Sequence, residues 1–133
     1  MGLSYMTKEQ KLFKGIIKAD LMIVQNYGKS DDKAERLLAA YHMQQAVEKT
    51  IKLKAELAGV NLWGHDISKL IQDCKKHNIY GKVSIPKYIE DRQVMITKWE
   101  ANCRYYPMTV IRRDSIMGVY RECSAWLNSG DTV

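Results

Sequence analysis

The chain is poor in the residues that interrupt or cross-link a fold. Its 133 residues include two prolines, eight glycines and three cysteines. Proline and glycine are the residues that most often end helices, so their scarcity favours long helices with few breaks. Cys74, Cys103 and Cys123 are odd in number and have no short paired spacing. This pattern argues against a disulfide framework and fits reduced thiols.

Long apolar runs and targeting segments are missing as well. No run of 18 apolar residues occurs, so we expect no membrane span and no membrane partner. The first 15 residues, MGLSYMTKEQKLFKG, lack the apolar core of a signal peptide. Together with the reduced cysteines, these absences predict a cytoplasmic protein.

Several sequence motifs of known chemistry are also absent. The chain contains no Gly-x-Gly-x-x-Gly motif, no phosphate-loop motif and no Gly-x-Ser-x-Gly motif. Cys74 and His77 have the spacing of half a zinc site, but no second pair with zinc-like spacing exists. We therefore expect neither a metal nor a cofactor.

What the chain does have is an ordinary apolar content and an excess of positive charge. Apolar residues make up 46% and charged residues 27%, as in a folded domain. At this length we expect one domain, residues 1–133. The net charge of +6 and the pI of about 9.2 favour acidic partners such as phosphates, nucleotides or nucleic acid.

Helical periodicity is found in five segments, and no segment shows the alternation of a strand. The segments are expected at 7–27, from about 30 to 58, at 66–77, from 84 to Pro107, and around Ile116, Tyr120, Cys123 and Leu127. We expect Thr7 to cap the first helix and Ser30 or Asp31 to cap the second. Ser84 is the expected cap of the fourth helix. The predicted fold class is all-α, an up-and-down helical bundle of four to five helices.

A carboxylate interrupts the apolar stripe of the first helix. Asp20 lies in a predicted core stripe at helical spacing, together with Phe13, Ile16, Ile17, Ile23, Val24 and Tyr27. Because an unpaired buried charge is costly, we expect Asp20 to be paired inside the bundle, with Arg92, Lys49 or His42 as the partner. Asp20 and Arg92 are therefore predicted to be structural buried polar residues.

The second helix has two apolar sides with a polar strip between them. One side contains Leu37, Ala40, Gln44, Val47, Ile51, Ala55 and Ala58, and the other contains Ala39, His42, Ala46, Leu53 and Leu57. The strip contains Gln45, Lys49, Lys52 and Glu56. A helix with two apolar sides packs within its own bundle and against a further surface, which could be a second copy. We therefore expect a dimer that uses the second helix or its neighbours.

Three motifs resemble one known family. Residues 41–52 read Tyr-His-x-Gln-Gln-Ala-x-Glu-Lys-x-x-Lys, residues 65–70 read His-Asp-Ile-x-x-Leu, and residues 104–107 read Arg-Tyr-Tyr-Pro. These motifs resemble the HEPN domain family, most closely the branch commonly encoded beside minimal nucleotidyltransferases. The resemblance covers roughly residues 20–127. It implies a HEPN-like bundle of four to five helices that forms a homodimer, contacts nucleotides or RNA, and has a nucleotidyltransferase as its partner.

Many HEPN proteins are metal-independent ribonucleases with an Arg-x4-6-His motif, usually late in the bundle. Here the only match is Arg36 with His42, and a spacing of six residues places the two side chains about 120° apart around one helix. We interpret this match as coincidence. A ribonuclease would still need a general acid, a general base and a cation, for which His42, His65 and Arg104 are candidates. His65 is also interpreted as a capping residue beside Asp66.

The leading hypothesis is a nucleotide- or RNA-binding module that partners a nucleotidyltransferase in a toxin–antitoxin or defence system. The candidate ligand contacts are His42, Gln45, Lys49, Lys52, Arg104 and Tyr105. Tyr105 would stack on a base while Arg104 pairs with a phosphate. Two alternatives stay open: a metal-independent ribonuclease toxin, and a dimeric helical scaffold without nucleic-acid contact.

Overall fold

The computed structural model describes residues 6–129, which form seven helices and no strand. The helices are α1 (Lys8–Tyr27), α2 (Lys33–Leu57), α3 (Ile67–Lys76), α4 (Tyr80–Val83), α5 (Lys87–Asp91), α6 (Gln93–Tyr105) and α7 (Arg113–Asn128). The all-α class is confirmed. The two ends of the expected domain, residues 1–5 and 130–133, lie outside the described residues.

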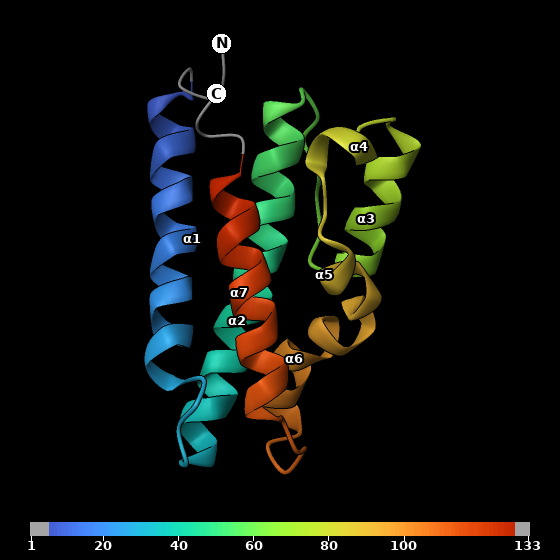
Figure 1. Cartoon of the computed structure of the whole chain (residues 1–133). Coiled ribbons are helices and arrows are strands. Elements are labelled where there is room, and N and C mark those ends of the chain that lie inside the picture. Colours follow the sequence, from blue (N-terminus) through green and yellow to red (C-terminus); the bar gives the residue numbers. More distant parts are fainter. Residues whose placement is uncertain (1–5, 130–133) are drawn as a thin grey trace.

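The long helices form an up-and-down bundle around α2. Figure 1 shows α1 and α7 side by side, with α2 behind them and α3 to α5 on the other side of the molecule. α2 packs against α1, α3, α4, α6 and α7. A helix enclosed in this way buries residues on most of its circumference, which explains why it is apolar on two sides.

The second apolar side of α2 is covered by the chain itself. Ala39 and Ala46 are fully buried within a single chain, and Leu53 is 2% exposed. The expectation that a second copy covers this side is therefore wrong. A homodimer remains a prediction, but it needs a different surface.

The core side of α1 is shifted from the predicted one. Its buried residues include Ile17, Leu21 and Val24, as well as Asp20. Ile16 and Tyr27, which were expected in the core, are 43% and 37% exposed. Leu12 and Met22 are also exposed, so α1 presents apolar side chains to solvent.

Polar side chains set the helix ends. Thr7 caps α1 as predicted. Its hydroxyl accepts from the backbone N–H of Gln10 at 3.0 Å, and the Gln10 side chain accepts from the backbone N–H of Thr7 at 2.9 Å, which together form a capping box. The cap of α2 is Asp32, which accepts a hydrogen bond from the backbone of Glu35 at 3.1 Å, and not Ser30 or Asp31. The hydroxyl of Ser30 accepts instead from the backbone N–H of Asp32 at 3.0 Å, which orders the turn before the cap.

The expected fourth helix is divided. The backbone breaks at Arg92 between α5 and α6, and a one-turn helix, α4, forms in the segment expected to be a break. Ser84 does not cap a following helix: it ends α4 in the left-handed conformation, with a φ of 54°. Pro86 disfavours helical backbone in the residue before it, so the next helix begins only after the proline.

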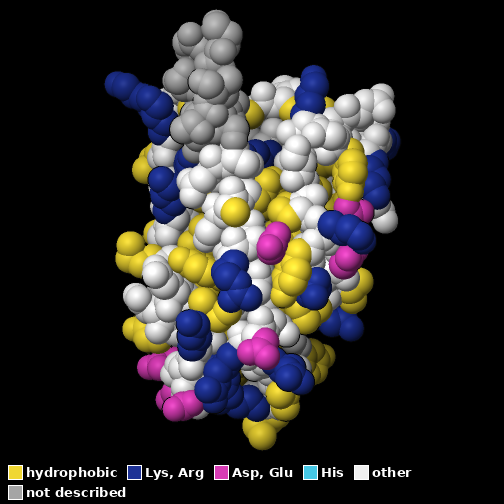
Figure 2. All heavy atoms as spheres, viewed as in Figure 1, with side chains coloured by type: hydrophobic (Ala, Val, Ile, Leu, Met, Phe, Trp, Pro, Cys, Tyr) yellow, Lys and Arg dark blue, Asp and Glu magenta, His cyan; other side chains and the backbone are white. Residues whose placement is uncertain are grey.

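The surface over α7 mixes apolar and charged side chains (Figure 2). Lys and Arg side chains gather at the lower end of this view. Lys29, Arg113 and Arg121 border one hollow that also includes Asp114. Arg113 forms an ion pair of 2.9 Å with Asp31 there. Within residues 6–129, no helix is both long and apolar enough to cross a bilayer.

Candidate functional site

Gln45, Lys49 and Lys52 of the predicted strip lie on the same side of α2 as His42, and from here on these four residues are called the polar strip. They recur at three- and four-residue spacing, so their side chains point to one side of the helix. Side chains from α1 and α6 contact the strip, and the loop between α2 and α3 contacts Glu48 beside it. The bundle thus brings together polar groups that lie far apart in the sequence.

Asp20 of α1 is the first anchor of the strip. One carboxylate oxygen lies 2.9 Å from Nδ1 of His42, and the other accepts from Nζ of Lys49 at 2.8 Å. The Asp20 side chain is only 9% exposed, so an ammonium partner offsets the cost of burying its charge. An ionised carboxylate can only accept, so Nδ1 of His42 carries a proton. In the neutral ring, Nε2 is then left as a proton acceptor.

Glu48 of α2 is the second anchor, and like Asp20 it contacts one lysine and one histidine. Its carboxylate lies 3.0 Å from Nζ of Lys52 and 3.0 Å from Nδ1 of His65, while its side chain is 4% exposed. Gln44 donates to Glu48 and to the backbone carbonyl of His65, each at 3.4 Å. Glu48 and Gln44 belong to the motif of residues 41–52, but they were not among the predicted ligand contacts. The Glu48–Lys52 spacing of one helical turn was the signal that could have identified the pair.

Gln45 connects the strip to α6. Its amide nitrogen donates to Oε1 of Gln44 at 2.9 Å and to Oε2 of Glu100 at 3.3 Å. The carboxylates of Asp20, Glu48 and Glu100 therefore outnumber the two strip lysines, which gives a formal charge of −1 with neutral histidines. Because both strip lysines are held by buried carboxylates, the strip has no excess of cations to attract a phosphate.

An exposed cation lies at the end of the strip. The guanidinium of Arg104, in the last turn of α6, lies 5.9 Å from the ring centroid of Tyr41, and that ring meets the His42 ring edge-on at 5.3 Å. A hydrogen bond with the Tyr41 hydroxyl, then the charge of Glu100 and a hydrogen bond with Tyr105, raise the pKa of Arg104. Arg104 is thus a permanent positive charge facing solvent.

Two exposed aromatic residues directly follow this cation in the sequence. Tyr105 is 70% exposed and Tyr106 is 63% exposed. Large aromatic side chains normally bury much of their surface, so adjacent exposed rings are a surface on which a planar group can stack. We call Tyr41, Arg104, Tyr105 and Tyr106 the Arg104 cluster.

The three catalytic candidates do not form one acid–base site. His65 is 74% exposed and is anchored at Glu48, which lies six residues, or about 9 Å of helical rise, beyond His42. In the part of the chain that the structure describes, no hydrogen bond or ion pair joins His65 to His42 or Arg104. His65 does not cap α3; Asp66 does, by accepting from the backbone of Ser68 at 2.9 Å.

Two further arginines lie away from the strip. Arg36 donates to the carbonyls of Ser30 and Asp31 at 2.8 and 2.9 Å, so it holds the turn between α1 and α2. Arg92 is half-buried and is not a partner of Asp20, which corrects that expectation. It stacks on the Tyr88 ring, 3.5 Å from its centroid, and donates to the Tyr88 carbonyl at 3.1 Å. Arg92 lies at the break between α5 and α6, and this break places its side chain against Tyr88.

The cysteines are free thiols. Burial raises the pKa of Cys74 to about 11 and that of Cys123 to about 12, which keeps both protonated near neutral pH. Cys74 is buried and His77 is exposed, so the two candidate zinc ligands face different environments. Between residues 6 and 129, no three histidine, cysteine or acidic side chains are grouped as metal ligands.

Comparison with known proteins gives a family match. The model of the HEPN domain matches residues 29–124, a range that contains the polar strip, both carboxylate-bound histidines and the Arg104 cluster. Comparison with curated proteins and with solved structures gives no match. The family match spans well over half of the chain. The chain therefore belongs to the HEPN domain family.

Proposed function

We propose that this HEPN domain is a nucleotide- or RNA-binding module whose ligand contacts the Arg104 cluster. The observation that supports this most is the exposed guanidinium of Arg104, which contacts Tyr41 and Tyr105 and is followed by the exposed Tyr106. A guanidinium pairs with phosphate through two parallel hydrogen bonds, and tyrosine rings stack on bases. The cluster therefore offers both kinds of contact that a single-stranded RNA requires.

The polar strip has a supporting role in this proposal. Lys49 and Lys52 each have a carboxylate partner, so their first task is to hold Asp20 and Glu48 in place. Asp20 in turn fixes the His42 ring with Nε2 free, next to the Tyr41 ring of the cluster. His42 is then the strip residue best placed to meet a ligand bound at Arg104, and Gln45 keeps α6 and Arg104 in register with α2.

The proposed partners follow the resemblance of residues 41–52 to the nucleotidyltransferase-associated branch. We propose a nucleotidyltransferase as the partner protein, in a toxin–antitoxin or defence system of the cytoplasm, where three free thiols stay reduced. A second copy of the chain would pack on the exposed apolar side of α1, which includes Leu12 and Ile16. A gene for a small nucleotidyltransferase next to the gene for this chain supports the pairing, and its absence weakens it.

The binding proposal is tested with a fluorescently labelled single-stranded RNA and fluorescence anisotropy. Arg104→Ala and Tyr105→Ala should each weaken binding by about tenfold, which corresponds to the loss of one charged or stacking contact. The control is Lys87→Ala, which removes the same charge from an exposed lysine that forms an ion pair with Asp91. Equal losses in all three variants would mean that the cluster is not the binding site.

A metal-independent ribonuclease is the second candidate, because the Asp20–His42 contact is the arrangement that orients a histidine for proton transfer. His42→Ala separates the two functions. A ribonuclease variant keeps most of its RNA affinity and stops cleaving, whereas a binding module loses some affinity and has no cleavage to lose. A scaffold without nucleic-acid contact shows neither binding nor cleavage before the substitution.

A further inference from the structure

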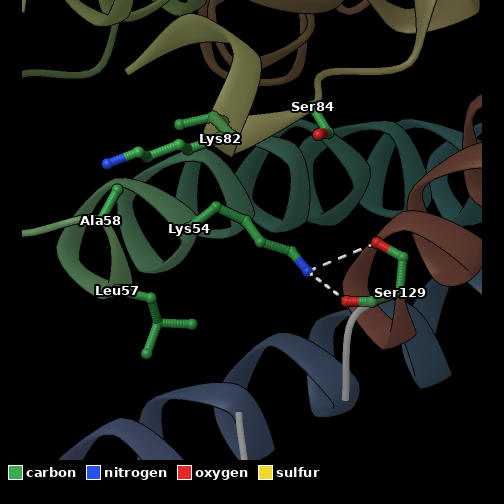
Figure 3. Close-up of a pocket in the computed structure, with 7 residues that line it drawn as sticks. Lys54, Leu57, Ala58, Lys82, Ser84 and Ser129 are labelled. Carbon is green, nitrogen blue, oxygen red and sulfur yellow. Dashed lines mark hydrogen bonds between the residues drawn. The ribbon is translucent and has the colours of Figure 1, made fainter. Parts of the chain in front are cut away.

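A hollow outside the candidate site lies on the side of α2 opposite the polar strip. Its volume is about 480 Å³, and Figure 3 shows it between the end of α2, the α4 turn and the end of α7. The lining residues are Lys54, Leu57, Ala58, Lys82, Val83, Ser84 and Ser129. Lys49 and Lys54 are five residues apart, which is about 140° around the helix, so the hollow and the strip are separate surfaces.

Lys54 is a buried cation with neutral partners. It is 8% exposed, and its ammonium donates to the carbonyl of Ser129 at 2.8 Å and to the Ser129 hydroxyl at 3.5 Å. Figure 3 shows both contacts at one side of the hollow. Ser129 is the C-cap of α7, so Lys54 stabilises the negative end of that helix dipole. In the described range, no ion pair joins Lys54 to a carboxylate.

Among the described residues that line the hollow, the charged ones, Lys54 and Lys82, are both cations. Burial, then the nearby charge of Lys14, lowers the pKa of Lys54. Lys82 lies exposed on the rim, and Figure 3 shows its amine directed away from Ser129. The hydroxyl of Ser84 also lines the hollow, while Leu57, Ala58 and Val83 supply an apolar wall. Buried charges in proteins are normally paired, so this hollow has room and charge for an anion that the described side chains do not supply.

We propose that this hollow binds a small oxyanion, a carboxylate or a phosphate monoester. The oxyanion accepts a hydrogen bond from the ammonium of Lys54, which has three donors and uses two of them on Ser129. The Ser84 hydroxyl, which lines the hollow, donates to the carbonyl of Gly81 at 2.8 Å and is not counted as a donor to the ligand. Lys82 attracts the ligand from the rim. An apolar substituent on the ligand packs against Leu57, Ala58 and Val83, which distinguishes the site from a surface patch that attracts any anion.

The first test uses thermal unfolding with four probes at constant ionic strength: chloride, inorganic phosphate, phenyl phosphate and phenylacetate. A ligand at ten times its Kd should raise the Tm by a few degrees, since it binds only the folded chain. We expect both aromatic probes to raise the Tm more than inorganic phosphate, and chloride to have no effect. The stronger of the two aromatic probes identifies the head group. If no probe exceeds chloride, the hollow is not an oxyanion site.

The second test places the probe in the hollow. Lys54→Met keeps the apolar stem and should weaken binding at least tenfold, Lys82→Met should weaken it about threefold, and the exposed control Lys76→Met should leave it unchanged. In the wild type, the amide resonances of Val83, Ser84 and Ser129 should shift on titration, which does not depend on whether a variant folds. Wild-type affinity in Lys54→Met, or shifts confined to other residues, overturns the proposal.

The inference is independent of the proposed RNA function. Arg104→Ala should bind the small probes as the wild type does, because Arg104 lies in the last turn of α6 and does not line the hollow. A wild-type protein that binds the probes but no RNA contradicts the proposed function alone. A wild-type protein that binds RNA but none of the probes contradicts this inference alone.

Discussion

Asp20 and Glu48 determine the geometry of the polar strip, because each buried carboxylate holds one lysine and one histidine. Of the three partners predicted for Asp20, His42 and Lys49 are confirmed, and the sequence itself gives the reason. His42 and Lys49 are seven residues, or two helical turns, apart, so both face the same neighbour. Arg92 could not be excluded in the same way, because the break that turns it toward Tyr88 depends on tertiary packing. The roles of Glu48 and Gln44 depend on the loop that carries His65, which no helical period specifies.

Asp20→Ala should lower the free energy of unfolding by about 3 kcal/mol, since it leaves the Lys49 charge half-buried without its partner. Urea unfolding followed by circular dichroism measures this loss. The matched control is Asp91→Ala, which breaks an exposed pair with Lys87 and should change stability by no more than about 0.5 kcal/mol. Equal changes in the two variants would mean that the Asp20 contacts do not contribute to stability.

At the scale of elements, the close approach of α5 and α7 explains why the expected fourth helix is broken. The Tyr88 ring of α5 fits against Gly118 of α7, where a Cβ atom would overlap its hydroxyl, and Arg92 stacks on the Tyr88 ring. The periodicity of residues 88–103 predicted helix throughout, and most of these residues are helical. The break could not be predicted, because it arises from packing around one glycine thirty residues away in the sequence.

Gly118→Ala should lower the free energy of unfolding by about 1 to 3 kcal/mol, because the added methyl group displaces a ring that Arg92 holds in place. Gly15→Ala in α1 is the control. No atom lies near its Cβ position, so it should raise stability by about 0.5 to 1 kcal/mol through helix propensity. In a Tyr88→Ala background the cost of Gly118→Ala should nearly vanish. An unchanged cost in that background would place the strain elsewhere.

At the scale of the molecule, α2 is enclosed by its own chain, and apolar surface remains on α1. The family and the all-α bundle could be predicted because long motifs and helical periods are local properties of a sequence. The surface for a second copy could not be predicted. Two apolar sides on α2 are compatible either with a partner chain or with burial by the other helices of the same chain. Leu12 and Ile16 are exposed on one side of α1, and this is the surface proposed above for a second copy.

Light scattering at tens of micromolar should give twice the mass of one chain, and Leu12→Glu with Ile16→Glu should reduce it to one. Val94→Glu provides the control, because Val94 is 60% exposed on α6 and lies outside the α1 surface. A monomeric wild type contradicts the homodimer. A dimer that survives both α1 substitutions means that another surface forms it.

The salt dependence of RNA binding tests the account most directly. Each phosphate that the protein neutralises releases counterions, so the logarithm of the association constant should fall with the logarithm of salt concentration by about 0.7 per phosphate for a single strand. We predict such a slope for the wild type between 50 and 200 mM salt, and a slope shallower by about 0.7 for Arg104→Ala, with Lys87→Ala unchanged. A wild type that binds no RNA or nucleotide, or an Arg104→Ala variant with the wild-type slope, would contradict the account.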